Sequence, residues 1–256
     1  MKTAICKLCL QEKKLLNQSH IIPNFMFKSL NKEKKGMFFT TFNNLTKIKN
    51  KKEKRFTGEF EGNLLCEDCD NKLLGSIYEA YGHKVLYDLK QLPKDERPIF
   101  TAGKSLDGLG FIHCSNLNYQ KFKLFLLSIL WRASISSRPF FNEIHLEHHE
   151  DILRKMIYSG DAGKVSDYPI FIATYANDKN SPKELIAKPQ KNFKDGKTSV
   201  VFMMDGAFYI FYISCEEKEI PNYVLSETIK LSNEMNMVVF PTGTSRDKVL
   251  GFAGLI

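Results

Sequence analysis

The sequence predicts an α+β protein in two parts: a small cysteine-containing module over residues 1–92, and an α+β domain with an antiparallel sheet over residues 98–256. Three observations support this division. Two Cys-x-x-Cys pairs lie close to the start of the chain. The stretch "LPKDERPIF" at 92–100 holds charged residues between two prolines, as linkers do. Long helical patterns followed by strand-like runs come after this linker, and such separate runs are typical of the α+β class.

Size and composition exclude several classes of protein. At 256 residues, with 43% hydrophobic residues, the chain is long enough to bury a sizeable core. It contains no stretch of 18 uncharged apolar residues, which argues against a membrane-spanning helix. The start "MKTAICKLC" lacks the apolar core of a secretory signal. We therefore expect a cytoplasmic protein without a membrane partner.

The positive charge is concentrated near the start of the chain. The formal net charge is +8, and residues 1–72 contain 15 Lys and Arg against 8 Asp and Glu, whereas the remainder contains 22 against 21. Nucleic acid is the polyanion that suits such a region, and a solvated basic surface accounts for the charge equally well. The candidate contacts to nucleic acid are Lys47, Lys49, Lys51, Lys52, Lys54 and Arg55.

The two Cys-x-x-Cys pairs are Cys6 with Cys9, in "CKLC", and Cys66 with Cys69, in "CEDC". Each pair presents two thiolates from one tight turn, so that two pairs complete a closed tetrahedral zinc site. A reducing cytoplasm disfavours disulfides, and neither pair lies in the βαβ pattern that usually surrounds a redox motif. We therefore predict that these four cysteines bind one structural Zn²⁺.

The elements around the cysteines predict the fold of the N-terminal module. Residues 31–60 mix Lys and Phe without a period, and we interpret them as a basic loop or loose hairpin inserted between the two cysteine pairs. Residues 70–90 have apolar residues at helical spacing, and Asp70 or Asn71 can cap this helix. A Cys-x-x-Cys turn, a hairpin, and a second Cys-x-x-Cys at the start of a helix describe a treble-clef, or ββα, zinc fold.

The C-terminal part combines helices with strands. Residues 118–136 form the strongest helical pattern, and residues 146–160 form a second helix with an acidic first turn and Gly160 at its end. Residues 198–214 contain Asp205-Gly206 between two apolar runs, which is a strong hairpin signal. The other strand candidates are residues 168–176, 236–241 and 249–256.

The order of motifs in the first third of the chain resembles the zinc-containing HNH endonucleases, also called His-Me finger or ββα-metal nucleases. The first cysteine pair is followed by "SHIIP" at 19–23 and by "GNLLCEDCDNK" at 62–72. The resemblance implies that His20 is the general base that activates water, a role that suits an imidazole because its pKa lies near neutrality. It also implies that Asn63 orients His20, that Asp70 binds a catalytic Mg²⁺ or other divalent cation, and that the zinc is structural.

Three positions depart from the pattern of that family. Ser19 stands where these nucleases carry Asp, Glu or His as a metal ligand, and a serine is a poor ligand for a hard cation. Asn63 lies closer to its cysteine than usual, and Lys72 is one position early. Either the metal site is rebuilt, or the module has lost catalysis and kept binding, with His20 as a structural residue. The candidates for a rebuilt metal site are Asp70, Asn71 and Glu79.

The function expected from this resemblance is metal-dependent hydrolysis of DNA phosphodiester bonds, in bacterial defence or in a mobile element. Two alternatives remain open at this point. One is a zinc module without catalytic activity that binds nucleic acid or a protein partner, including a second copy of the chain. The other is a regulator whose C-terminal domain senses a small ligand and whose zinc module delivers the response.

Overall fold

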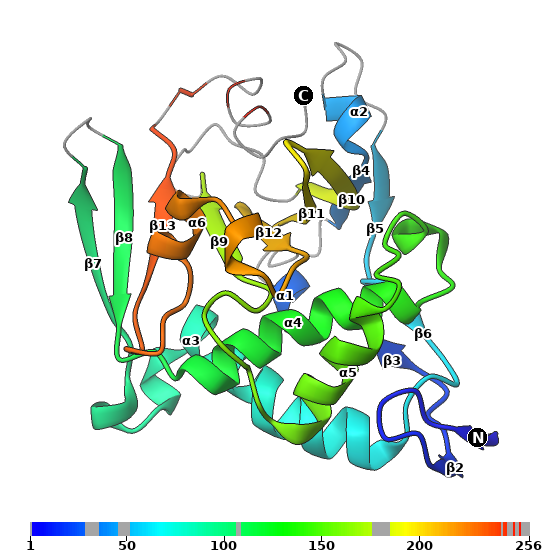
Figure 1. Cartoon of the computed structure of the whole chain (residues 1–256). Helices are drawn as coiled ribbons and strands as arrows, with labels where there is room; N and C mark the ends of the chain where they lie inside the picture. Colours follow the sequence, from blue (N-terminus) through cyan, green and yellow to red (C-terminus); the bar gives the residue numbers. More distant parts are fainter. Residues whose placement is uncertain are drawn as a thin grey trace.

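The computed structural model describes residues 2–28, 36–45, 52–105, 109–175 and 185–241, together with residues 243, 244, 248 and 251 (Figure 1). Within these residues it confirms an α+β fold with one large, mostly antiparallel sheet. The longer helices gather on one side of the sheet, and the N-terminus lies beside them (Figure 1). No described helix is both long and apolar enough to cross a membrane.

Nine strands form the large sheet. They are β4 (Met37–Thr40), β5 (Glu53–Arg55), β7 (Ile99–Lys104), β8 (Gly110–Ser115), β9 (Ile170–Thr174), β10 (Leu185–Lys194), β11 (Lys197–Met204), β12 (Ala207–Tyr212) and β13 (Met235–Val239). Their order across the sheet is β5-β4-β10-β11-β12-β9-β13-β8-β7. Two neighbouring pairs, β4–β10 and β9–β13, are parallel, and the others are antiparallel.

The central strands are buried on both faces. In β9, Ile170 and Ile172 pack into the apolar cluster that includes the helices, whereas Phe171 and Ala173 pack into a second cluster on the opposite face. A strand that is covered on both faces reads as a continuous apolar run, which is the pattern from which residues 168–176 were predicted. The hairpin predicted at Asp205-Gly206 is confirmed, since both residues have positive φ in the turn between β11 and β12.

Strand β10 was not predicted from the sequence. It begins as the apolar run Leu185–Ala187 and continues through Lys188, Pro189 and Gln190, which have low strand propensity. The pairing of β10 with β11 shifts register between Ala187 and Gln190, and this irregularity accommodates the proline, which has no N–H to donate to a neighbouring strand. The strand candidate at 249–256 lies outside the described residues, apart from Gly251.

The helices are η1 (Asp68–Glu79), α3 (Ala80–Tyr87), α4 (Tyr119–Ile135), α5 (His149–Ser159) and α6 (Asn222–Glu227), with shorter turns at α1 (Phe25–Lys28), α2 (Phe42–Leu45), η2 (Leu89–Gln91), η3 (Lys94–Glu96), η4 (Pro139–Phe141) and η5 (Glu217–Glu219). Helix α4 is the most deeply buried. It begins where the Asn118 side chain accepts a 2.9 Å hydrogen bond from the N–H of Lys121. Helix α5 ends at Gly160, in left-handed conformation. Both helices were predicted.

The helix predicted at 70–90 is present as two continuous segments, η1 and α3. Segment η1 is a π-helix, and at its end the N–H of Ala80 bonds to the carbonyl of Gly75, five residues earlier. Segment α3 packs against α4 at Gly82, where a Cβ atom would come within 2.6 Å of the Phe125 ring. The absence of a side chain at Gly82 therefore allows the close approach of the two helices.

Four short strands surround the cysteines. Strands β1 (Thr3–Ile5) and β2 (Glu12–Lys14) pair antiparallel on either side of the first Cys-x-x-Cys turn. Strands β3 (Ser19–His20) and β6 (Phe60–Glu61) also pair antiparallel. After β6 the chain reaches Cys66, and η1 then begins at Asp68 and contains Cys69.

Two strands within the predicted inserted segment 31–60 belong to the large sheet. Its strands β4 and β5 pair antiparallel, and β4 also pairs in parallel with β10, with Phe38 opposite Leu185. Met37 and Phe39 belong to the same apolar cluster as Ile186 and the buried face of α4. The division into 1–92 and 98–256 stays a prediction about folding units, while in the structure the two stretches share a sheet and a core.

Candidate functional site

The four predicted zinc ligands converge. Their Sγ atoms all lie within 4.8 Å of one another, although the two pairs are more than 50 residues apart in the chain. Cys6 and Cys9 lie in the turn between β1 and β2, Cys66 pairs with Leu15 in an isolated bridge, and Cys69 lies in the first turn of η1. Within the described part of the chain, this is the one group of three or more His, Cys, Asp or Glu residues that can hold a metal ion.

The cysteine cluster fits a structural Zn²⁺. Tetrahedral zinc with Zn–S bonds of ~2.3 Å places its sulfur ligands roughly 3.8 Å apart, within the span of these thiols. The hydrogen bond from the Cys69 thiol lowers the pKa of Cys6 to about 4 and raises that of Cys69 itself. The N–H of Cys66 also lies 3.4 Å from the Cys6 sulfur and donates to it. The cluster thus already favours a thiolate, which is the form that binds zinc.

His20 lies beside this cluster, on β3. Its strand partner is Phe60 on β6, and the two rings meet edge to face with centroids 6.3 Å apart. The pairing of β3 with β6 depends on Gly62, because a Cβ atom there would come within 2.4 Å of the Asn17 carbonyl oxygen. The imidazole is half-buried, and the hydrogen bonds of the described residues include none to its ring nitrogens. The ring is therefore available to a substrate.

A buried arginine holds the backbone at His20. The Arg132 guanidinium donates a 2.8 Å hydrogen bond to the His20 carbonyl and forms a 2.7 Å ion pair with Glu79 on η1. It is fixed on α4 by further bonds to the backbone and hydroxyl of Ser128. The Arg132 side chain is 2% exposed, so this arginine joins α4, β3 and η1 inside the protein.

The surroundings of His20 favour its neutral form. Burial lowers the pKa of His20, the nearby Glu79 carboxylate opposes this shift, and the Arg132 charge adds to it. Because an unperturbed histidine has a pKa near 6.5, the ring is neutral at pH 7 and can accept a proton. This electrostatic state is the one that a general base requires.

Asp70 and Ser19 lie on the inner side of the same region. Burial raises the pKa of Asp70 to about 6, and Arg132 opposes this shift. The Ser19 hydroxyl faces the Asp70 carboxyl, yet Ser19 is buried and its Oγ completes no hydrogen bond of ordinary geometry within the described structure. The position where the HNH nucleases carry a metal ligand is therefore polar, enclosed and unsatisfied.

Asn63 lies in a turn beside the β3–β6 ladder. It lies exposed in the turn after β6, with φ of 62°, and its N–H bonds to the Leu16 carbonyl at 2.8 Å. Asparagine tolerates this left-handed conformation better than most residues. The hydrogen bonds of the described residues do not join its side chain to His20, so the orienting role of Asn63 stays a prediction.

The residues expected to bind a catalytic cation do not form a three-ligand site. Asp70 and Glu79 are absent from the single metal-ligating group found in the described residues, and the third candidate, Asn71, is exposed on η1. Glu79 is already paired with Arg132, and Ser19 provides no carboxylate. Lys72, which stands one position early relative to the HNH pattern, forms a 2.6 Å ion pair with Asp68. The donors present therefore fit zinc at the cysteines and do not fit a preformed site for a second cation.

The candidate nucleic-acid contacts are only partly described. Lys47, Lys49 and Lys51 lie outside the described residues. Lys52 and Lys54 are exposed and rest over the rings of Phe38 and Phe56, at 5.8 and 5.5 Å from the ring centroids. Arg55 differs, because it is paired with Glu53 and Glu59. The lysines are therefore open to a phosphate, whereas Arg55 has a structural role.

Two arginines of this region were not among the predicted site residues. Arg132 is one, and its signal in the sequence was a charge that follows Ser128 by four residues within the apolar stretch of the helix that starts at Leu124. The other is Arg138, whose Nε donates a 2.7 Å hydrogen bond to the Phe60 carbonyl and whose guanidinium lies 5.5 Å from the Phe60 ring centroid. Arg138 is 41% exposed, so it places an accessible positive charge next to the strand partner of His20.

Comparison of the chain with protein-family models, with curated protein sequences and with solved structures finds no match. The fold and the site define the class of protein as an α+β chain with a cluster of four cysteines that can hold a metal ion. The resemblance to the HNH endonucleases is thus carried by residues of this chain alone: the cysteine pairs, "SHIIP", and the helix that follows the second pair.

Proposed function

We propose that this chain is an endonuclease of the HNH type that hydrolyses phosphodiester bonds in DNA, with a treble-clef module closed by zinc. One observation carries the proposal. Burial holds the pKa of His20 below its usual value, and its ring nitrogens have no hydrogen-bond partner among the described residues. The two-strand ladder that carries His20 is followed by a helix that begins at four converging cysteines. These features support the ββα arrangement that the resemblance implies.

In the proposed reaction His20 acts as general base. The imidazole accepts a proton from a water molecule, whose oxygen bonds to phosphorus while the bond from phosphorus to the leaving sugar oxygen breaks. The leaving oxygen takes a proton from solvent, so that charge and atoms balance. Arg138 donates to the Phe60 carbonyl and its side chain is 41% exposed, and we assign it to the phosphate. Arg132 acts as a positioning residue, because it holds the His20 backbone.

The proposed mechanism contains no step through a second cation, because the donors near His20 do not fit a three-ligand site. Zn²⁺ at Cys6, Cys9, Cys66 and Cys69 would hold the module together and would not contact the substrate. The family pattern implies Mg²⁺ or another divalent cation bound through Asp70. Activity of the zinc-loaded protein in buffer without added divalent cation, and again after addition of Mg²⁺ or Mn²⁺, tests that implication directly.

The His20→Ala variant tests the proposal. General base catalysis typically contributes ~10²–10⁴-fold, so the rate of plasmid nicking should fall by at least about a hundredfold, while zinc content and melting temperature stay unchanged. The His145→Ala variant is a matched control, because His145 is an exposed histidine outside the site. A wild-type protein that cleaves no DNA under any of these metal conditions would overturn the enzyme proposal.

A second function, binding without catalysis, is favoured by one specific observation. Arg132 neutralises Glu79 at 2.7 Å, and Ser19 replaces a ligand, so the region has features of a module that retained its fold while losing its cation site. In that case DNA should bind with equal affinity to the wild type and to His20→Ala. Turnover in the wild type distinguishes the two functions.

A further inference from the structure

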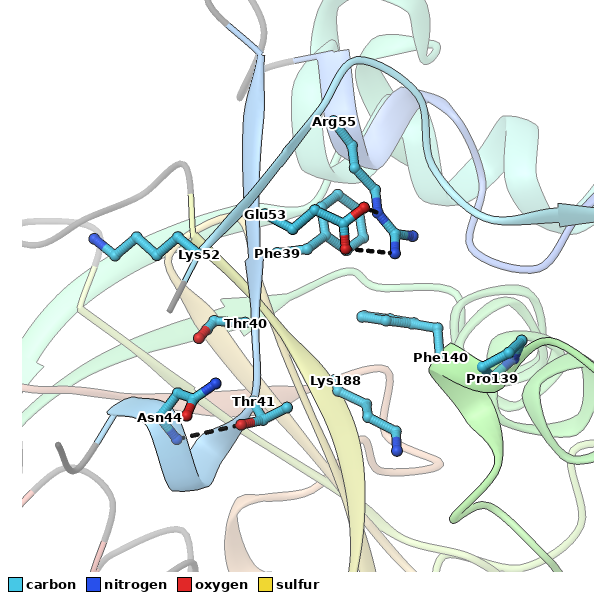
Figure 2. A pocket seen from close by; sticks show the side chains of 10 residues that line it. All are labelled: Phe39, Thr40, Thr41, Asn44, Lys52, Glu53, Arg55, Pro139, Phe140 and Lys188. Carbon is cyan, nitrogen blue, oxygen red and sulfur yellow. Dashed lines mark hydrogen bonds and ion pairs between the residues drawn. The ribbon is translucent and has the colours of Figure 1, made fainter. Parts of the chain in front are cut away.

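A cavity of about 420 Å³ lies where the inserted strands β4 and β5 meet the C-terminal part of the chain (Figure 2). Strands β4, β5 and β10 and the turn η4 line it, and its volume is within the ~300–1,000 Å³ of small-molecule sites. Its lining shares no residue with the site around His20. The side chains that matter for its chemistry are Phe39, Phe140, Arg55, Lys52 and Lys188.

Aromatic rings and a guanidinium plane form one side of the cavity. The rings of Phe39 and Phe140 meet edge to face, with centroids 5.2 Å apart. The Arg55 guanidinium lies 4.8 Å from the centroid of Phe39, and its Nε donates a 2.7 Å hydrogen bond to Glu53 (Figure 2). Glu53 and Glu59 hold Arg55 in place over the Phe39 ring. This side of the cavity is therefore a fixed surface of guanidinium and aromatic edges, against which a planar ring can pack.

Two lysines provide positive charge at the opposite boundaries of the cavity. Lys52 is exposed, and Lys188 reaches the cavity from β10 (Figure 2). Lys188 forms a 3.0 Å ion pair with Glu143, whose side chain is 51% exposed. An ion pair with such an exposed partner is weak, so that Lys188 can exchange Glu143 for the phosphate of a ligand. A surface of guanidinium and aromatic edges between two lysines matches the chemistry of a nucleotide.

The cavity connects to His20 along the chain. Phe60, the strand partner of His20, follows Arg55 on the cavity wall by five positions, a stretch that spans at most ~18 Å. Arg138 lies along this path, near both Phe60 and Glu59. A nucleic-acid strand seated in the cavity could therefore reach His20 within a few nucleotides while passing an exposed arginine.

We propose that this cavity binds one unpaired nucleotide of a nucleic-acid strand, with the base against Phe39 and Phe140 and the flanking phosphates at Lys52 and Lys188. The inference rests on the proposed function and adds to it a substrate class, because a concave site admits a base only where the strand is single or locally opened. It also gives the inserted segment 31–60 a role: its strands form the cavity together with β10.

Binding to a labelled six-nucleotide single strand tests the inference in full-length His20→Ala protein, which leaves the probe uncut. Fluorescence anisotropy gives the Kd at several salt concentrations. Lys188→Glu should weaken binding about tenfold, and Lys52→Glu, a change at an exposed side chain, should have a similar effect. The matched control is Lys194→Glu, an exposed lysine on the same strand β10 but outside the cavity, which should change the Kd less than twofold. A duplex of the same length should bind at least tenfold more weakly than the single strand.

Equal losses for Lys188→Glu and Lys194→Glu, or equal affinity for single strand and duplex, would overturn the inference. So would a poly-glutamate peptide that binds in a Lys188-dependent manner while the oligonucleotide does not. The outcome is independent of catalysis. If the wild type never cleaves DNA but its binding depends on Lys188 as expected, the proposed enzyme is refuted and the nucleotide-binding cavity is supported. If the wild type cleaves DNA and binding does not depend on Lys188, the enzyme is supported and the cavity is refuted.

Discussion

Arg132 and Glu79 form an ion pair of 2.7 Å between two helices, and the same guanidinium nitrogen donates to the backbone carbonyl of His20. The arginine is 2% exposed and the glutamate 20% exposed, so the pair lies largely out of water. Removing one partner of such a pair leaves the other without compensation for its lost hydration.

Arg132→Met should therefore destabilise the protein. We expect a loss of about 3 kcal/mol in the free energy of unfolding, near the lower end of the range for broken buried pairs because Glu79 is partly exposed. Urea unfolding followed by circular dichroism measures it. The double variant Arg132→Met/Glu79→Gln should recover part of the loss, since it removes the uncompensated carboxylate. A double variant no more stable than the single one would show that the arginine acts through packing alone.

The same two residues should shift the pKa of His20 in opposite directions. Glu79 raises this pKa and Arg132 lowers it, so Glu79→Gln should lower it further and Arg132→Met should raise it. Because the folded protein holds the pKa of His20 below its unfolded value, His20 contributes stability above pH ~6.5 that is lost as the pH falls toward the folded pKa. NMR titration of the His20 ring measures the shifts without any assay of activity, and identical titration curves in both variants would contradict them.

Removal of one cysteine ligand should unfold the N-terminal module. We expect one zinc per chain by elemental analysis, and Cys66→Ser should lose both the metal and the cooperative unfolding transition, because binding energy in such a site is folding energy. Cys215→Ser is the control, since that thiol is exposed and lies outside the cluster. An intact fold that contains no zinc would contradict the prediction.

Ser19→Asp places a carboxylate in the buried position that faces Asp70. Without a cation, the second charge should lower the melting temperature, because a buried carboxylate with a like-charged neighbour is unfavourable. Addition of Mn²⁺ or Mg²⁺ should restore part of the loss if the two carboxylates bind the ion together. Ser19→Asn is the neutral control of the same size. Equal melting temperatures with and without divalent cation would exclude this rebuilt site.

Lys123 should make stability depend on pH in the alkaline range. Its ammonium is buried in α4 and bonds to the Tyr119 hydroxyl at 2.9 Å and to the Lys164 carbonyl at 2.6 Å. Burial lowers the pKa of Lys123 to about 8. The unfolded chain then holds the extra proton between about pH 8 and pH 10.5, so stability should rise with pH across that window, by about 1 to 3 kcal/mol. Urea unfolding of Lys123→Met should lack this rise.

Local patterns predicted much of the fold. Residues 168–176 are a continuous apolar run, and Asp205-Gly206 encodes its own turn, so strands and hairpin were recognised from short stretches of sequence. Strand β10 could not be recognised in this way, because Lys188 and Pro189 are unfavourable in a strand and the pairing partners β4 and β11 make them part of one. Its existence depends on contacts between residues far apart in the chain.

The candidate site shows the same contrast. The cysteines were predicted because a Cys-x-x-Cys turn fixes the position of two ligands within four residues. The pair of Arg132 and Glu79 joins residues on different helices, and its geometry follows from the packing of α4 on η1, which no local pattern encodes. Asn63 was assigned from the motif alone, whereas its backbone conformation directs it into an exposed turn.

The parallel pairing of β4 with β10 also determines how late in synthesis the sheet can be completed. Phe38 and Leu185 lie opposite each other although 147 residues separate them in the chain. At ~5–20 residues per second the ribosome needs about 7 to 30 s to make the second strand after the first. Cys69 is made long before Leu185, so the nascent chain can take up its metal ion while the edge of β4 still lacks its neighbour. Of the residues that line the cavity, Lys188 of β10 is made last. A chain released before that point could bind metal at its cysteines but would lack the cavity.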